Sequence, residues 1–181
     1  MTTPWRLIAV AASCAALATG CVDLWSEPVT EPLQNGRFPA GALTLITAEC
    51  QVVNEVAPRL RSLLAAAHAE GVGLTPETSS FLPPGVPGPP KIESCYRSYE
   101  GQVWWRDYYC SIGKCQNAAT PGTSKHGLGR AVDFQDQLGE LTFESPGYLW
   151  LAAHAAEYGF FQPANQQQGA PGEEAWHWEA S

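Results

Sequence analysis

Charged residues are scarce in this sequence of 181 residues. Only 15% are Asp, Glu, Lys or Arg, and the 18 acidic side chains outnumber the 10 basic ones. No run of Lys or Arg occurs, which argues against contacts with phosphates, so we expect no nucleic-acid partner. Hydrophobic residues make up 45% of the chain, too many for a disordered protein. The length suits one domain, and the sequence contains no internal repeat.

A stretch of about 20 apolar residues, long enough to span a bilayer as a helix, is also missing. Residues 7–18 are apolar and follow one charged residue, Arg6, as in a secretion signal. Small residues at 18–20 precede Cys21, which resembles the lipobox of bacterial lipoproteins, where that Cys is acylated. We therefore expect residues 1–20 to be a signal peptide and the protein to be exported, either as a cell-envelope lipoprotein anchored at Cys21 or in secreted form.

The remaining sequence is expected to contain a tether and one domain. Residues 21–41 carry prolines among acidic residues and are predicted to be a tether, which leaves residues 42–181 as the domain. A second proline-rich segment, residues 76–90, is predicted to be a long loop.

Helices and short strands both occur in the expected domain. Apolar spacing predicts a helix over about 53–67, in which Pro58 either introduces a kink or begins a second helix. Capping residues predict helices over about 98–109 and 145–158. Short strands are predicted at residues 91–95, 131–134, 160–162 and 176–179. This mixture is typical of an α+β domain.

Four cysteines remain if the signal peptide is removed and Cys21 carries lipid. An even number in an oxidising compartment indicates two disulfides. Three pairings are possible, and the short separation favours Cys110 with Cys115, which leaves Cys50 with Cys95. A cysteine metal cluster is the alternative, although the spacings do not match paired C-x-x-C knuckles.

Residues 124–134 (SKHGLGRAVDF) contain the first candidate metal ligands. His126 and Asp133 offer a nitrogen and an oxygen, and the glycines between them allow a turn sharp enough to direct both at one point. By itself the pattern is more simply explained by a His in a turn and a solvated Asp.

Two further segments carry residues suited to catalysis. In residues 174–179 (EAWHWE), strand geometry places His177 on the face opposite to the two tryptophans. Glu174 would share a site with His177 only if it lay in the turn that precedes the strand. Residues 95–102 (CYRSYEGQ) place Arg97 before a predicted helix. An edge strand that covers the core and an ordinary surface Arg are the simpler interpretations.

Taken together and in this order, the motifs Y-R-S-x-x-x-Q, S-x-H-x-x-G-x-A-x-D and E-x-W-H resemble those of the VanY-type zinc D-alanyl-D-alanine carboxypeptidases, a family of bacterial peptidoglycan peptidases. The resemblance extends from about residue 91 to the C-terminus. It implies a small α+β domain with a central antiparallel sheet flanked by helices, a fold shared with the hedgehog signalling domain. It also implies a zinc metallopeptidase that acts on peptidoglycan stem peptides.

The resemblance also assigns roles to individual residues. One Zn²⁺ would be bound by His126, Asp133 and His177, which leaves the fourth position of a tetrahedral site for water or substrate. Glu174 would be the general base, and Arg97 would stabilise charge on the carbonyl oxygen. Ser124 and Gln102 would contact substrate. No serine or cysteine nucleophile is then required.

The sequence departs from the family pattern in two places. Cys95 stands where the common S-G-Y-R-S form has Gly, and a disulfide there would rigidify the segment that carries Arg97. The proline-rich residues 76–90 look like an insertion that could line the cleft. Lys125 and Arg130 could attract an acidic stem peptide or be merely solvated. Two other histidines belong to no ligand motif and are predicted to be structural, His68 and His154.

The motifs leave several functions open. The same zinc site could serve an L,D-carboxypeptidase or an endopeptidase, because the motifs specify bond cleavage and not the flanking residues. A non-catalytic, zinc-stabilised wall-binding module is the alternative outside enzymes. Glu174 and Arg97 favour the enzyme, since a binding module needs no general base. We expect a monomer whose only membrane contact is the N-terminal lipid.

Overall fold

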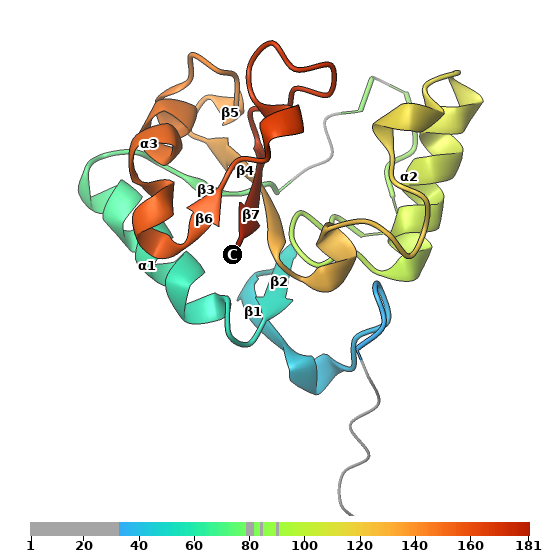
Figure 1. Ribbon diagram of the computed structural model, residues 1–181, viewed down its shortest axis with the longest axis horizontal. Helices are drawn as coiled ribbons and strands as arrows, with labels where there is room; N and C mark the ends of the chain where they lie inside the picture. Colours follow the sequence, from blue (N-terminus) through green and yellow to red (C-terminus); the bar gives the residue numbers. More distant parts are fainter. Residues whose placement is uncertain (1–32, 79–81, 84, 90) are drawn as a thin grey trace, which may run out of the picture. The chain divides into compact units, whose positions relative to one another are not determined.

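A computed structural model describes residues 33–78, 82–83, 85–89 and 91–181 (Figure 1). The expected signal peptide, Cys21 and most of the expected tether lie outside these ranges. From residue 33 to Ser181 the described chain belongs to one compact unit. None of its helices combines the length and the apolar character needed to cross a membrane.

The described chain has the predicted α+β fold, with two antiparallel sheets. A small sheet pairs β1 (Leu43–Thr47) with β2 (Cys50–Val53). The larger sheet has the order β3-β4-β7-β6, and β5 pairs with β4. Its strands are β3 (Thr75–Pro76), β4 (Ala131–Asp136), β5 (Gly139–Glu140), β6 (Phe160–Phe161) and β7 (His177–Ala180).

The helices lie around the larger sheet. They are α1 (Ala57–Ala69), α2 (Tyr99–Ser111) and α3 (Pro146–His154). In Figure 1, α1 and α3 lie together on one side of β4 and β7, whereas α2 lies on the other. The hydrophobic core joins α1, α3 and the two sheets, with Leu60, Phe134 and Leu151 among its fully buried members. Since no residue of α2 belongs to this core, the helix leaves room for a cleft beside β4 and β7.

Helix α1 begins later than predicted. Residues 50–53 belong to strand β2, and Pro58 lies in the first turn of the helix, where its missing N–H costs nothing. Pro58 thus begins a helix rather than kinking one. Leu60, Leu63 and Ala67 are buried, because a spacing of three or four residues returns to the same helix face.

The predicted helix starts at Ser98 and Ser145 are both present, but only Ser98 caps its helix through the side chain. Its Oγ accepts a hydrogen bond from the N–H of Gly101 at 3.0 Å. The Ser145 hydroxyl instead donates to the carbonyl of Thr142 at 2.8 Å. Helix α3 ends at His154 and continues as a 3-10 turn, Ala155–Tyr158.

The structure differs from the sequence prediction in several short strands and at the start of the domain. Residues 91–95 do not form a strand of either sheet. Strands β1 and β2 occur where no strand was expected. Residues 33–41, assigned to the tether, pack on the domain: the Gly36 N–H donates to the Gly127 carbonyl, and the Tyr99 N–H donates to the Gly36 carbonyl, both at 2.8 Å. The folded domain therefore includes the end of the expected tether.

Both disulfides join the cysteines that the sequence favoured. Cys50 is bonded to Cys95, and Cys110 to Cys115. The first links β2 to the segment before α2, and the second links the end of α2 to a following 3-10 turn, Cys115–Asn117.

Candidate metal centre and catalytic cleft

Three predicted ligands, His126, Asp133 and His177, meet at one point beside the larger sheet. Asp133 and His177 are paired residues of the antiparallel strands β4 and β7, so their side chains project from the same face. His126 begins a 3-10 turn, His126–Leu128, that precedes β4. Gly129 follows this turn with φ of 64°, a conformation that favours glycine. The chain can therefore reverse and bring His126 over Asp133.

The geometry of these three residues fits a tetrahedral zinc site. His126 Nε2 lies 3.2 Å from Asp133 Oδ1 and 3.1 Å from His177 Nδ1, and His177 Nδ1 lies 3.0 Å from Asp133 Oδ1. In a tetrahedral zinc site with bonds of about 2.0–2.1 Å, ligand atoms are about 3.3 Å apart. All three residues are buried. The donor set and its spacing therefore suit one Zn²⁺.

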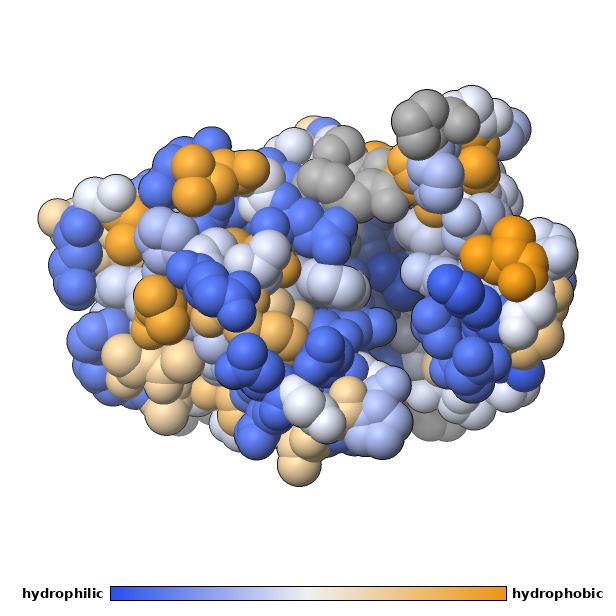
Figure 2. Space-filling model, turned by 90° about the horizontal axis from the view of Figure 1, so that it is seen from above, coloured by the Kyte–Doolittle hydropathy of each residue, from blue (hydrophilic) through white to orange (hydrophobic). Residues whose placement is uncertain are grey.

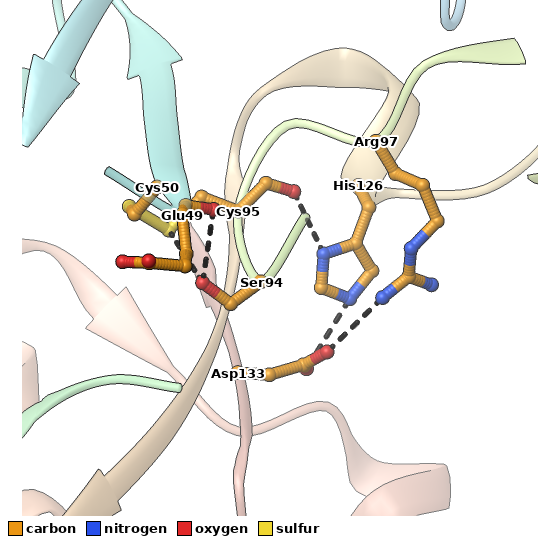
Figure 3. Close-up of a disulfide and its surroundings, with 7 residues drawn as sticks. All are labelled: Glu49, Cys50, Ser94, Cys95, Arg97, His126 and Asp133. Atoms are coloured by element: carbon orange, nitrogen blue, oxygen red, sulfur yellow. Dashed lines mark hydrogen bonds and ion pairs between the residues drawn. A yellow bond between two sulfur atoms is a disulfide. The ribbon is translucent and has the colours of Figure 1, made fainter. Parts of the chain in front are cut away.

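The orientation of His126 is determined by a backbone carbonyl (Figure 3). His126 Nδ1 donates to the Cys95 carbonyl at 2.8 Å. This hydrogen bond leaves Nε2 without a proton and directed at the other ligands, as required for metal binding.

The protonation tendencies of the ligands are consistent with a cation site. Burial lowers the pKa of His126, which favours the neutral ring. The pKa of Asp133 is well below its usual range, because the two histidines outweigh the effect of burial. Burial lowers the pKa of His177, but hydrogen bonds to Asp133 and Glu179 raise it more, to about 9. A cation bound at this point would displace the proton from His177.

Arg97 lies next to the ligand cluster. Its Nη2 donates to Asp133 Oδ2 at 3.3 Å, and its guanidinium carbon lies 5.7 Å from the centre of the Trp105 ring. Its Nε is buried and has no hydrogen-bond partner among the described residues. The guanidinium therefore retains donor capacity beside the metal ligands.

Contrary to the sequence prediction, Glu174 lies after the turn at residues 171–172 and not in it, yet it lines the same cleft as His177. The Gln166 side chain donates to Glu174 Oε2 at 3.0 Å, and the Glu174 N–H donates to the Gln166 carbonyl at 2.9 Å. Burial raises the pKa of Glu174 to about 7, and the charge of Asp133 adds to this effect. A carboxyl that titrates near neutrality can both accept and donate a proton.

A cleft of about 630 Å³ contains all these groups, and Figure 2 shows it as a recess with hydrophilic residues inside. Trp105 and Tyr109 of α2 line one wall, and Trp176 also lines the cleft. Leu82 and Pro83 contribute as well, in agreement with the prediction that the 76–90 loop could line the cleft.

The sequence did not reveal one acidic residue of this cleft, Glu77. Its N–H donates to the Asp133 carbonyl at 2.9 Å, and its side chain lines the cleft. Burial raises its pKa to about 9, and the charges of Asp133 and Glu140 add to the shift. No motif contains Glu77, and the sequence assigned it to the proline-rich loop of residues 76–90, so no signal pointed to the cleft.

A model of the VanY family, described as D-alanyl-D-alanine carboxypeptidase, matches residues 88–179. The chain belongs to the VanY family. The match covers the three predicted metal ligands, Arg97 and Glu174. No curated protein was found to match the chain.

Solved structures of VanY-type peptidases share the fold. VanYB in complex with D-alanine-D-alanine is 23% identical, with a TM-score of 0.57 over 85% of this chain and 80% of that chain. The LdcB LD-carboxypeptidase is 24% identical, with a TM-score of 0.58 over 82% and 74%. A mutant of the vancomycin resistance D,D-pentapeptidase VanY in complex with Zn(II) is 25% identical, with a TM-score of 0.56 over 82% and 86%.

Ser124 and Gln102, which were predicted to contact substrate, have different surroundings in this member of the VanY family. Ser124 lines the cleft and is partly exposed. Gln102 also lines it but is buried, and both N–H groups of its amide are used: Nε2 donates to Asn35 Oδ1 and the Arg97 carbonyl, while Oε1 accepts from the Gly122 N–H. Gln102 is therefore built into the cleft wall, and its contact with substrate stays a prediction.

The remaining polar residues divide between the cleft and the surface. Lys125 lines the cleft, 3.9 Å from Glu179, whereas Arg130 pairs with Glu55 at the surface. His68 contacts the Leu74 carbonyl at 2.7 Å, and His154 pairs with Glu157. These two histidines have the structural surroundings that the sequence predicted.

Proposed function

We propose that the protein is a zinc-dependent D-alanyl-D-alanine carboxypeptidase that hydrolyses stem peptides of peptidoglycan. The observation that carries the proposal is the convergence of His126, Asp133 and His177 in the cleft that also contains Glu174 and Arg97. Membership of the VanY family supports the reaction class. The Zn(II) complex of a 25% identical relative supports the choice of metal.

The residues of the cleft suit hydrolysis of a peptide bond. A bound zinc ion would supply a Lewis acid for the scissile carbonyl and would acidify the attacking water. Glu174 takes the proton of that water and passes it to the leaving amine. Gln166 occupies one Glu174 oxygen and leaves the other to accept the proton. Arg97 stabilises the negative charge that develops on the carbonyl oxygen.

Two related activities use the same residues. A 24% identical structural relative is described as an LD-carboxypeptidase, so L,D-carboxypeptidase activity is the second candidate. An endopeptidase that cuts cross-bridges would need the cleft to admit chain on both sides of the bond. The partly buried carboxyl of Glu174 argues against a non-catalytic module, because a structural zinc site does not need it.

A panel of defined peptides tests the proposal. Zinc-loaded protein would be incubated with pentapeptide stems ending in D-Ala-D-Ala, tetrapeptide stems ending in one D-Ala, and cross-linked dimers, and the products identified by mass spectrometry. We expect loss of one D-Ala from the pentapeptide. Cleavage of the tetrapeptide alone would indicate an L,D-carboxypeptidase, cleavage of the dimer alone an endopeptidase, and no cleavage with zinc fully bound would contradict all three.

The proposed substrate requires the protein to act outside the cytoplasm. We propose that residues 1–20 direct export, that Cys21 carries lipid, and that a tether up to about residue 32 connects the anchor to a monomeric domain. Mass analysis of the N-terminal peptide from a bacterial envelope fraction would detect an acylated Cys21. An unmodified N-terminal peptide with residues 1–20 removed would indicate secretion instead.

A further inference from the structure

We infer that the Cys50–Cys95 disulfide is a positioning element of the metal centre, so that zinc affinity depends on this bond (Figure 3). The inference rests on the metal site of the proposed function. It assigns the cross-link a task beyond stabilising the fold. Cys95 contributes both the sulfur that is bonded to β2 and the carbonyl that orients His126.

The backbone around Cys95 connects the two sheets. On one side, the Ser94 N–H donates to the Glu49 carbonyl at 3.3 Å and the Tyr96 N–H donates to the Gln51 carbonyl at 2.7 Å. On the other side, the Ser94 carbonyl accepts from the Asp133 N–H at 2.7 Å. Residues 94–96 therefore bridge the β1-β2 hairpin and the strand that carries a metal ligand.

This short segment also holds the partners of two metal ligands. The Cys95 carbonyl accepts from His126 Nδ1 at 2.8 Å, and the Arg97 N–H donates to the His126 carbonyl at 3.1 Å. The Arg97 side chain donates to Asp133 at 3.3 Å. A displacement of residues 95–97 would thus disturb His126 and Asp133 together.

The disulfide is the covalent support of this arrangement. Both cysteines are fully buried, and the bond attaches residue 95 to β2 of the separate two-stranded sheet. Without it, the segment would depend on the Ser94 and Tyr96 hydrogen bonds to keep its place against β2. Loss of a hydrogen-bond partner behind a metal ligand typically lowers metal affinity about 10- to 100-fold. We expect a loss of this size when the bond is removed.

The second disulfide provides a matched control. Cys110 and Cys115 join the end of α2 to the following turn. Neither residue hydrogen-bonds to His126, Asp133 or His177 in the described part of the chain. Its removal should therefore leave zinc affinity within about three-fold of the wild-type value, well below the change expected for a ligand's direct partner.

The experiment compares full-length wild type, Cys50→Ser/Cys95→Ser and Cys110→Ser/Cys115→Ser. Zinc dissociation constants are measured by competition with a chromogenic chelator, and circular dichroism verifies the fold. We expect zinc to bind about 10- to 100-fold more weakly only in the Cys50/Cys95 variant, with excess zinc restoring occupancy. Equal affinities in all three proteins, or equal losses in both variants, would overturn the inference.

A second measurement covers the case in which the Cys50/Cys95 variant does not fold. Folded Cys110→Ser/Cys115→Ser protein is treated with a water-soluble phosphine. The phosphine takes oxygen from water to become its oxide, and the S–S bond breaks to give two thiols. Faster zinc release once peptide mapping shows Cys50 and Cys95 reduced supports the inference, and an unchanged release rate overturns it. Failure of the wild type to bind zinc would instead overturn the proposed function.

Discussion

Glu174 is the acidic residue of the cleft that the proposed mechanism uses as general base, although metal binding does not require it. Glu174→Gln preserves the size of the side chain and still allows a hydrogen bond with Gln166. It removes the carboxylate that would accept the proton. Turnover of a D-Ala-D-Ala peptide should fall about 100- to 10,000-fold, the usual contribution of general acid-base catalysis. Zinc content and the circular dichroism spectrum should stay at wild-type values. Near-normal turnover of the folded, zinc-bound variant would remove Glu174 from the mechanism.

A second prediction for single residues concerns the candidate metal ligands. His126→Ala/His177→Ala removes both ring nitrogens that face Asp133, and one remaining carboxylate cannot complete a zinc site. Elemental analysis should find about one zinc per wild-type chain and essentially none in this variant. His154→Ala is the matched control, because His154 pairs with Glu157 at the surface, and it should retain zinc. Full zinc content in the double variant would refute the ligand assignment.

The partly buried carboxyl of Glu77 should make the metal-free protein sensitive to pH. Its pKa is raised to about 9, chiefly by burial, so the folded state holds this proton more tightly than the unfolded state. The stabilisation is complete below the unfolded pKa and is lost as pH rises toward 9. Melting temperatures of chelator-treated protein should therefore decrease between pH 5 and 9.

Glu77→Gln should flatten this decrease, most visibly between pH 7 and 9, above the pKa of Glu174. Part of the slope should remain, since the pKa of His177 is also raised to about 9 and its proton is lost in the same range. Circular dichroism melting curves at each pH provide the measurement. An identical slope in wild type and Glu77→Gln would show that Glu77 is not a buried, protonated carboxyl.

The three candidate metal ligands could be predicted from the sequence, because each belongs to a short motif that resembles those of a known family. Glu77 could not, since its position in the cleft depends on the pairing of Pro76 with Phe134, residues far apart in the chain. The hydrogen bonds of Gln102 could not be predicted for a similar reason. Its partner Asn35 belongs to a segment whose composition resembles a tether, and only tertiary packing shows that the segment is folded.

At the scale of elements, capping residues predicted helix starts well, whereas short strands were harder to identify. The Ser98 and Ser145 positions precede α2 and α3, because local signals act within one turn. The hairpin of β1 and β2 was missed because Val53, the last residue of β2, also fits the apolar spacing of the predicted helix over 53–67. A strand of this length is stabilised by its partner rather than by its own sequence.

The two disulfides should differ in how much they stabilise the elements they join. The Cys50–Cys95 bond closes a loop with a sequence separation of 45, and Cys110–Cys115 one of 5. Loop-closure entropy then gives about 4 kcal/mol for the first and about 2 kcal/mol for the second. Urea unfolding of the two double Cys→Ser variants should show the larger loss for Cys50/Cys95. A larger loss for Cys110/Cys115 would mean that α2 depends on its C-terminal cross-link more than the core depends on β2.

At the scale of the whole described domain, the hydrophobic core and the cleft involve different helices. The core joins α1, α3 and both sheets, while α2 stands across the cleft and contributes aromatic residues to its wall. Two neighbouring strands, β4 and β7, place two of the three ligands through one residue pair. The predicted ligands of β4 and β7 therefore lie on a sheet that belongs to the core, whereas the aromatic wall of the cleft lies on a helix outside that core.

The central claim is that one zinc ion, bound at this site, is required for hydrolysis of stem peptides. The most direct measurement is a titration of metal-free protein with zinc while D-Ala release from purified muropeptides is followed by mass spectrometry. We predict no release without metal, a linear increase with added zinc, and a plateau at about one equivalent, as expected for a single three-ligand site. Release that persists after complete metal removal, or no release at full zinc occupancy, would contradict the account.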